Sequence, residues 1–230
     1  MKIVLATGNR GKISEIRRIL SDIEVQVLTF EDFDSFPDPE ETGSSFLANS
    51  LIKAKAVSEA TGLPALADDS GLEVDWLNGG PGIMSARYGG EGLDDRRRYL
   101  RLLEEMEGVP EHKRGARFRC VMTFYPAPAV EILPQPPGAE ADEIAELLGD
   151  DEKALVTEGF LYGRVAEEPA GEGGFGYDPV FYIPEEGKTA AQLRLEEKNR
   201  ISHRYRALVE MKRLIRRYCL SAQDTQGSSL

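Results

Sequence analysis

The chain opens with a short continuous apolar run that is followed by a helical repeat. Residues 2–7, KIVLAT, are typical of a buried strand and end at a Thr-Gly-Asn turn. Ile13, Ile16 and Leu20 then recur at helical spacing, with basic side chains between them. A strand, a glycine-containing turn and a helix in this order predict the opening of an α/β fold.

Strand-like apolar runs and helical spacings of apolar residues also occur through the rest of the chain. We predict strands at residues 25–30, 63–68, 72–77, 116–125 and 155–165, and helices at residues 46–61, 94–106 and 203–219. Ser44 or Ser45 would cap the helix over 46–61. Asn49 and Lys53 lie four residues apart in that helix, so they would share one face, away from its packing stripe.

Two segments interrupt this regular pattern. Residues 126–155 contain a proline-rich run and then an acidic stretch, after which strand-like residues resume. We therefore expect a variable surface excursion there and not a domain boundary. Residues 221–230 have a polar composition that is typical of a disordered tail. The length suits one sizeable domain or two lobes that share one sheet, and we expect a single domain over residues 1–220.

Composition and charge exclude several classes of protein. The net charge of −12 argues against a protein that coats nucleic acid. The sequence has no apolar run of about 18 residues, so we expect no membrane-spanning helix, and the first apolar run is too short for a signal peptide. A cytoplasmic location is therefore expected. Cys120 and Cys219 could form one disulfide, but two reduced thiols are typical of that compartment, and two histidines leave few ligands for structural zinc.

The turn after the first strand is a candidate phosphate-binding site. Its residues are Thr7, Gly8, Asn9, Arg10, Gly11 and Lys12. Backbone N–H groups at a helix start can bind an anion, and Lys12 adds a positive charge. The spacing differs from that of a P-loop, because two residues separate the glycines and Ile13 follows the lysine. A plain helix start with two glycines stays an alternative.

Two acidic stretches are candidate metal sites. Glu40 and Glu41 precede the helix over 46–61, where carboxylates can favour the helix dipole or help to hold Mg²⁺. Asp68 and Asp69 follow a short apolar strand, and we expect them to enter a Ser-Gly turn. Two adjacent carboxylates either repel and shift in pKa or share a cation, and one could polarise water for attack on phosphorus. A solvated turn is the alternative.

Two later segments carry groups that could bind a nucleobase. In residues 173–179, GGFGYDP, two aromatic rings offer stacking faces and Asp178 offers an acceptor, although a turn packed on the core is the alternative. In residues 197–204, EKNRISHR, the donors of Lys198, His203 and Arg204 could read the 6-keto group of a purine. A buried donor left unpaired costs ~1–3 kcal/mol, which is enough to discriminate between bases. A solvated basic helix face is the alternative.

Taken in order, six segments resemble the inosine triphosphate pyrophosphatase family, also called XTP/dITP diphosphatases. They are VLATGNRGK, EETGSSFLANSLIKA, ALADDSGLEVDWLNGGPGIMSARYGG, ARFRC, GGFGYDPVF and EKNRISHRYRAL. The resemblance fails only across residues 126–155. It implies an α/β fold with an elongated mixed β-sheet, flanking helices, and two lobes around a nucleotide-binding cleft. It also implies a homodimer that uses Mg²⁺ to hydrolyse ITP, dITP and XTP to the monophosphate and pyrophosphate.

The resemblance also implies roles for individual residues. Asp69 would be the general base and a metal ligand, and Glu41 would be the second metal ligand, with Glu40 as the alternative one position away. The expected substrate-binding residues are Thr7, Gly8, Asn9, Arg10, Gly11, Lys12, Asn49 and Lys53 for the triphosphate, Ser70 beside the base, and Phe175, Gly176, Tyr177, Asp178, Lys198, His203 and Arg204 for the nucleoside.

Two other functions stay open at this point. One is a nucleotide pyrophosphatase with a different base specificity, such as an enzyme that acts on modified pyrimidines. The other is a nucleotide-binding regulator without catalysis, although the complete set of carboxylates and lysines argues against it.

Overall fold

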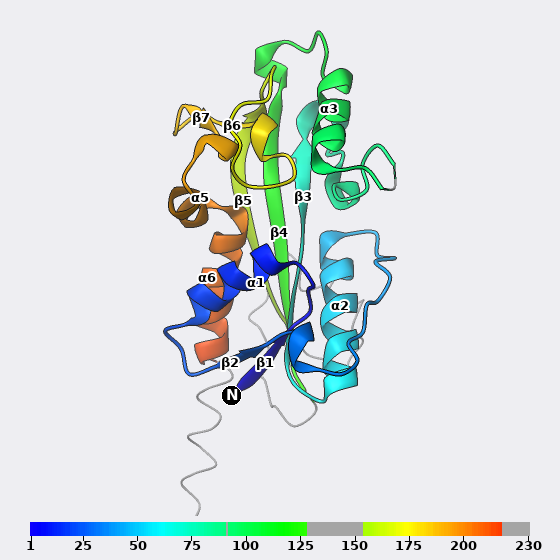
Figure 1. The fold of residues 1–230 in the computed structure, drawn as a ribbon, viewed down its shortest axis with the longest axis vertical. Coiled ribbons are helices and arrows are strands. Elements are labelled where there is room, and N and C mark those ends of the chain that lie inside the picture. Colours follow the sequence, from blue (N-terminus) through cyan, green and yellow to red (C-terminus); the bar gives the residue numbers. More distant parts are fainter. Residues whose placement is uncertain (91, 128–153, 218–230) are drawn as a thin grey trace, which may run out of the picture. The chain divides into compact units, whose positions relative to one another are not determined.

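The computed structural model describes residues 1–90, 92–127 and 154–217, and in them the chain forms a mixed β-sheet with helices packed against it (Figure 1). The strands are β1 (Lys2–Leu5), β2 (Gln26–Leu28), β3 (Ala65–Val74), β4 (Gly115–Tyr125), β5 (Leu155–Val165), β6 (Phe181–Ile183) and β7 (Lys188–Thr189). The α-helices are α1 (Arg10–Leu20), α2 (Phe46–Thr61), α3 (Asp95–Glu105), α5 (Leu195–Ile201) and α6 (His203–Ile215).

The strand order within the sheet is β2-β1-β3-β4-β5-β6-β7. β1 is parallel to β2 and β3, whereas β6 is antiparallel to β5 and β7. The predicted α/β fold with a mixed sheet and flanking helices is therefore confirmed.

The chain divides into two compact units. Among the described residues, the first contains 1–69, 121–127, 154–158 and 207–217, and the second contains 70–90, 92–120 and 159–206. In β3 the boundary falls between Asp69 and Ser70. The single domain expected over residues 1–220 stays a prediction. The excursion expected at 126–155 lies mostly, and the tail expected at 221–230 wholly, outside the described residues.

In the first unit, two parallel crossovers set the positions of α1 and α2. β1 pairs with β2 on one side, where Ile3 faces Val27, and with β3 on the other, where Val4 faces Ala65. The chain reaches β2 through α1 and then reaches β3 through α2. Because parallel crossovers are right-handed and these two run in opposite directions along the sheet, α1 and α2 cover opposite faces.

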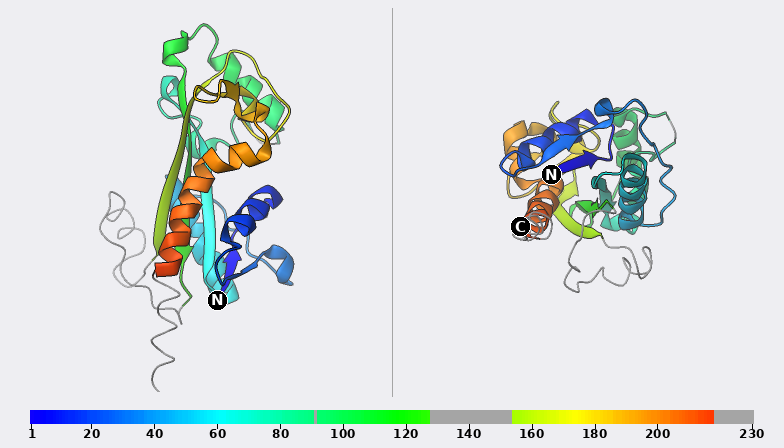
Figure 2. Two further views of the ribbon diagram at one scale, coloured as in Figure 1. Left: turned by 90° about the vertical axis from the view of Figure 1, so that its left-hand side faces the viewer. Right: turned by 90° about the horizontal axis from the view of Figure 1, so that it is seen from below.

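The predicted apolar stripe of α1 is buried, and its C-terminal end lies beside α6 (Figures 1 and 2). Lys212 of α6 donates to the carbonyl of Ile19 at 3.1 Å and pairs with Asp22 at 2.7 Å. On the other helix, small residues of α2 pack on β1 and β3, so that this helix lies close to the strands. The cluster consists of Val4, Ala6, Ala54, Val57, Ala65 and Ala67.

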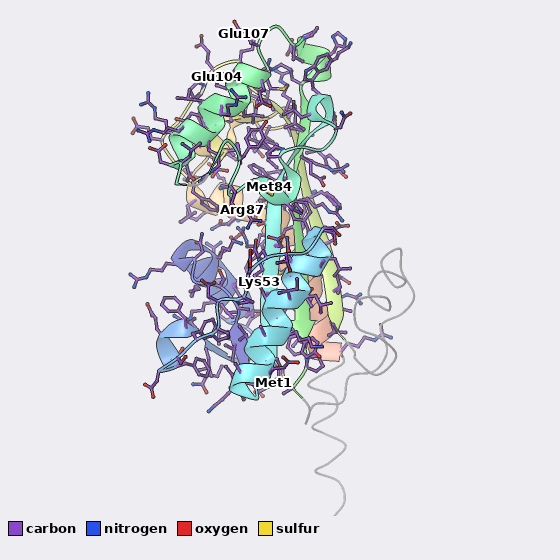
Figure 3. The ribbon with its side chains drawn as sticks, turned by 90° about the vertical axis from the view of Figure 1, so that its right-hand side faces the viewer. Met1, Lys53, Met84, Arg87, Glu104 and Glu107 are labelled. Carbon is purple, nitrogen blue, oxygen red and sulfur yellow. The ribbon has the colours of Figure 1, made fainter. Side chains whose placement is uncertain are left out.

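The second unit has its own apolar core. Leu102 and Met106 at the end of α3 pack with Phe118 of β4 and with Phe181 of β6. Arg114 is buried beside this core, where its guanidinium donates to the carbonyls of Met106, Val109, Val165 and Ala166. Each of its three guanidinium nitrogens thus donates at least one hydrogen bond, which compensates the burial of its charge. Figure 3 labels Met84 and Arg87 in the segment after β3, and Glu104 on α3.

The prediction of a Ser-Gly turn after Asp69 is wrong, because β3 runs without a break from Ala65 to Val74. Gly71 does not form a turn; its lack of a side chain allows another segment to come close to the strand. A Cβ on Gly71 would lie 2.6 Å from the Ser85 hydroxyl and closer still to the carbonyl of Gly82. A glycine inside a strand often marks such a contact with a neighbouring segment.

Several boundaries also differ from the predictions. The strand expected over 72–77 ends at Val74, and Asp75–Leu77 forms a 3₁₀ turn. β6, β7 and α5 are too short to give a clear period in the sequence. The last helix is described as far as Ile215.

Candidate active site

The turn between β1 and α1 is held by the side chain of Asn9. Its Oδ1 accepts hydrogen bonds from the N–H groups of Gly11 at 2.9 Å and Lys12 at 3.1 Å, so Asn9 caps the helix. The N–H of Asn9 in turn donates to the Thr7 hydroxyl at 3.2 Å. Three backbone amides of the candidate phosphate-binding turn, those of Asn9, Gly11 and Lys12, are therefore already bonded within the turn.

Lys12, in the first turn of α1, forms an ion pair with Asp68 of β3. The Lys12 ammonium lies 2.8 Å from Oδ2 of Asp68, whose side chain is only 1% exposed. A carboxylate buried to this extent needs such a cation, because an isolated charge is costly inside a protein.

Asp69, the next residue of β3, binds two residues of α2. Asn49 donates from Nδ2 to Oδ2 of Asp69 at 3.2 Å, and the Lys53 ammonium lies 3.4 Å from Oδ1. The predicted shared face of Asn49 and Lys53 is confirmed by these contacts, and Figure 3 labels Lys53 on α2. Asn49 also accepts from the N–H of Gly43 at 2.8 Å, so one amide joins the loop before α2 to Asp69.

Glu41 reaches the same lysine. Its Oε1 lies 2.7 Å from the Lys53 ammonium, so Lys53 lies within reach of both Glu41 and Asp69. Glu40 is exposed, whereas Glu41 is partly buried. The two carboxylates that converge on Lys53 are thus placed where one cation can contact both.

Strand geometry explains why the adjacent carboxylates are tolerated. Successive side chains of a strand point to opposite faces of the sheet. Asp68 accordingly meets Lys12 from α1, and Asp69 meets Asn49 and Lys53 from α2. Each carboxylate has its own lysine in this structure, so a shared cation is not required to explain their adjacency.

Burial raises the pKa of Asp69 above the ordinary value for an aspartate. The charges of Glu41 and Asp68 raise it further, whereas Lys53 and the hydrogen bond from Asn49 lower it. For Lys53, the three carboxylates outweigh the effect of burial and raise its pKa. Because the folded state favours protonated Asp69, this residue stabilises the folded protein at low pH. That stabilisation is lost as the pH rises through the raised pKa. Above that raised pKa, the charged Asp69 therefore costs folding free energy.

In the second unit, Ser70 contacts Arg204. The Arg204 guanidinium, which is 3% exposed, donates to the Ser70 hydroxyl at 3.2 Å. His203 is also buried, and its ring stacks on Phe118 with a centroid distance of 5.0 Å. The break between α5 and α6 at Ser202 places His203 and Arg204 at the start of α6.

The segment around Phe175 forms a compact loop in the second unit. Oδ2 of Asp178 accepts the N–H of Phe175 at 2.8 Å and forms an ion pair with Lys198. The Phe175 ring is 48% exposed, and the Lys198 ammonium lies 4.8 Å from its centroid. This exposed ring is free to stack on a flat ligand, in the geometry that aromatic pairs prefer.

Tyr177 has a different position from the one expected for a stacking ring. It is 4% exposed, and its hydroxyl donates to the carbonyl of Ser85 at 2.9 Å. Ser85 itself accepts the N–H of Leu72 at 2.9 Å through its hydroxyl. Tyr177 therefore connects its loop to the strand that carries Ser70, and Phe175 supplies the accessible ring.

The structure gathers most of the predicted residues into two groups. In the first unit, the charged and amide side chains of Lys12, Glu41, Asn49, Lys53 and Asp69 lie at or beside the Asp68–Asp69 pair. In the second unit, one contact joins Ser70 to Arg204, and Phe175 and Lys198 meet at Asp178. Arg10 joins neither group, because it forms an exposed ion pair with Glu31.

Two contributing residues, Ser85 and Asp95, were not predicted from the sequence, and neither was the partner of Asp68. That partner is Lys12, which the alternation of a continuous strand could have indicated. Ser85 and Asp95 support the loop around Phe175 from distant positions, and Asp95 accepts the N–H of Gly176 at 2.8 Å. No sequence signal links residues that lie so far apart along the chain.

Among the residues that the structure describes, no three Asp, Glu, His or Cys side chains form a ready-made metal cluster. Glu41 and Asp69 supply two carboxylates, which suits a cation that takes its other ligands from water and substrate phosphates.

None of the described helices has the length and apolar character needed to cross a membrane. Cys120 is buried in β4, and Cys219 lies outside the described residues, so their redox state stays a prediction.

A model of the Ham1 family matches residues 3–214. The chain belongs to the Ham1 family. The dITP/XTP pyrophosphatase of Escherichia coli (strain K12) is 44% identical over 207 residues, which cover 90% of this chain and 94% of that protein. The protein of the same name from Geobacillus kaustophilus (strain HTA426) is 45% identical over 210 residues, with 91% and 92% covered. The family expected from the motifs is thus confirmed.

Solved Ham1 structures agree with this fold. A HAM1 protein from Coxiella burnetii gives a TM-score of 0.80 at 39% identity and covers 94% of this chain and 99% of its own. The Ham1 protein of Staphylococcus aureus gives a TM-score of 0.76 at 36% identity, with 94% and 98% covered. Both groups of site residues in this Ham1 family member lie inside the matched range.

The burial and charges around Asp69 lead to a prediction for the metal-free protein. A carbon-13 NMR titration of the side-chain carboxyl groups should give Asp69 a pKa above the ordinary value of about 3.9. Lys53→Met should raise that pKa further, because the cation that favours the charged form is removed. As a control, Lys2→Met removes an exposed lysine at the start of β1 and should leave the pKa of Asp69 unchanged. An ordinary pKa for Asp69 in the wild type, or a pKa that does not change in Lys53→Met, would contradict this account.

Proposed function

We propose that this protein hydrolyses the non-standard purine nucleotides ITP, dITP and XTP to the monophosphate and pyrophosphate. The observation that carries the proposal is the buried Asp69, held by Asn49 and Lys53 with Glu41 beside it. The names and high coverage of the dITP/XTP pyrophosphatase relatives support the same reaction. Such an enzyme would remove deaminated purines from the nucleotide pool.

The first unit would bind the triphosphate and carry the reaction. Lys12 and Lys53 are cations that phosphate oxygens can approach, and both are now paired with carboxylates. A bound triphosphate would compete for these lysines, together with the turn from Thr7 to Lys12 and the amide of Asn49. Arg10 is expected at the edge of this surface, since its present partner is exposed.

Asp69 would act as the general base. Its raised pKa makes the carboxylate a better proton acceptor than an ordinary aspartate. A water molecule would lose its proton to Asp69 and attack the α-phosphorus. The bond from that phosphorus to the bridging oxygen would break, and pyrophosphate would leave with the electron pair.

We propose Mg²⁺ as the cofactor, with Glu41 and Asp69 as its protein ligands. When bound, it would neutralise charge that develops on the phosphates. The convergence of Glu41 and Asp69 on the Lys53 ammonium supports this pair, because both carboxylates already contact one cation there. The exposure of Glu40 makes it the weaker candidate.

The second unit would recognise the nucleoside. Phe175 would stack on the base, and the donors of Lys198, His203 and Arg204 would face its 6-keto group. A 6-amino group on adenine would leave such donors unpaired, which costs ~1–3 kcal/mol each. Guanine also has a 6-keto group, so its exclusion must depend on another position of the ring. Ser70, Gly176, Tyr177 and Asp178 would complete this region, with Tyr177 acting through Ser85 and not as a stacking ring.

The expected homodimer and the expected cytoplasmic location are part of this proposal, as is the absence of a nucleic-acid partner. The net charge of −12 supports the last point. A nucleotide triphosphate is the partner that the site chemistry favours.

A product assay tests the proposed reaction. The protein would be incubated with Mg²⁺ and, separately, with ITP, dITP, XTP, GTP, ATP and dTTP, and pyrophosphate and orthophosphate would be measured. We expect pyrophosphate and monophosphate from the first three, with GTP, ATP and dTTP largely spared. Orthophosphate release or equal use of all six would refute the proposal. Preference for dTTP would favour another base specificity, and binding without turnover would favour a regulator.

A matched pair of variants tests the metal ligand. Glu41→Gln should raise the Mg²⁺ concentration for half-maximal activity by at least about tenfold, because a charged ligand is lost. Glu40→Gln changes the neighbouring exposed carboxylate and should have little effect. The reverse order of effects would assign the ligand to Glu40, and equal small effects would remove this loop from the metal site.

A further inference from the structure

The loop that presents Phe175 is fixed at two consecutive amides by two different carboxylates. The N–H of Phe175 donates to Asp178, three residues along the chain. The N–H of Gly176 donates to Oδ2 of Asp95, which is 81 residues away in sequence, at 2.8 Å. The first bond lies inside the loop, whereas the second joins the loop to α3, in addition to the contacts of Tyr177 with Ser85 and of Lys198 with Asp178 and the Phe175 ring.

The carboxylate of Asp95 is itself held in a defined orientation. Asp95 is the first residue of α3, and its Oδ1 lies 2.7 Å from the Arg98 guanidinium. Arg98 also donates to the carbonyl of Leu93 at 2.5 Å, and its side chain is only 14% exposed. One oxygen of Asp95 is thus tied to its own helix, and the other is directed at the N–H of Gly176.

These backbone bonds help to position the ring of Phe175, which the Lys198 ammonium also contacts. Because it is 48% exposed, packing in the core does not fix it. Gly176 has a φ of 61°, a left-handed conformation that few other residues adopt readily. A charge-assisted hydrogen bond from its N–H to Asp95 stabilises that conformation, because such bonds are stronger than neutral ones.

We propose that Asp95 is a positioning residue for nucleobase binding, which holds the Phe175 loop through the N–H of Gly176. The inference rests on the proposed function, in which Phe175 stacks on the base. Asp95 does not touch the base or the phosphates in this account. Its loss should therefore weaken nucleotide binding and leave the hydrolytic groups of the first unit unchanged.

Asp95→Ala is the decisive variant, and Asp94→Ala is its matched control. Asp94 is the neighbouring residue that caps α3, where it accepts the N–H of Arg97 at 2.7 Å, and it has no bond to the loop. We expect Asp95→Ala to raise the KM for ITP about tenfold with little change in kcat, as the loss of a hydrogen bond to a charged group predicts. Asp94→Ala should leave the KM unchanged. Asp95→Asn keeps an acceptor oxygen and should recover part of the affinity.

Two further measurements separate positioning from general damage. Inhibition by inorganic tripolyphosphate, which has no base, should be equal in the wild type and in Asp95→Ala. The amide of Gly176 should exchange with solvent faster in Asp95→Ala than in the wild type or Asp94→Ala. An unchanged KM for ITP, or unchanged exchange at Gly176, would overturn the inference, and so would an equal effect of Asp94→Ala. A wild type that does not hydrolyse ITP would instead refute the proposed function, whereas faster Gly176 exchange would still establish the contact.

Discussion

Two buried carboxylates on consecutive residues of one strand are the constraint on which the rest of the candidate site depends. Strand alternation sends Asp68 and Asp69 to opposite faces of β3, so each needs its own cation from its own helix. Lys12 on α1 and Lys53 on α2 provide these charges. The right-handed crossovers around β1 place the two helices on opposite faces, and the topology thus delivers one lysine to each carboxylate.

In the proposed function, the residue that acts as the base is also one that costs stability. A charged Asp69 with a raised pKa costs folding free energy, and the chain keeps it next to Glu41 and Lys53. Sites with such a cost are typical of catalysis. In the second unit, by contrast, polar groups are used for support. Asp178 and Asp95 bind backbone amides and Tyr177 binds a carbonyl, which leaves the Phe175 ring accessible.

Local patterns predicted much of this from the sequence. The period of α2 put Asn49 and Lys53 on one face, and both reach Asp69. The same reasoning failed where a contact with another segment decides the structure. Gly71 was predicted to lie in a turn, yet it lies in a strand, where the lack of a side chain lets Gly82 and Ser85 approach. Tyr177 reads as a stacking ring, but its hydroxyl bonds to a carbonyl 92 residues away. Such pairings depend on the fold and have no local signature.

The central claim is that Asp69 is the base, and Asp69→Asn tests it most directly. The substitution keeps the shape of the side chain and an acceptor for Asn49, but removes the carboxylate that takes a proton from water. The account predicts a folded variant that binds ITP in calorimetry within a few-fold of the wild type, while the rate of pyrophosphate release falls by about 10² or more. A variant that binds ITP and releases pyrophosphate at a near-normal rate would contradict the account.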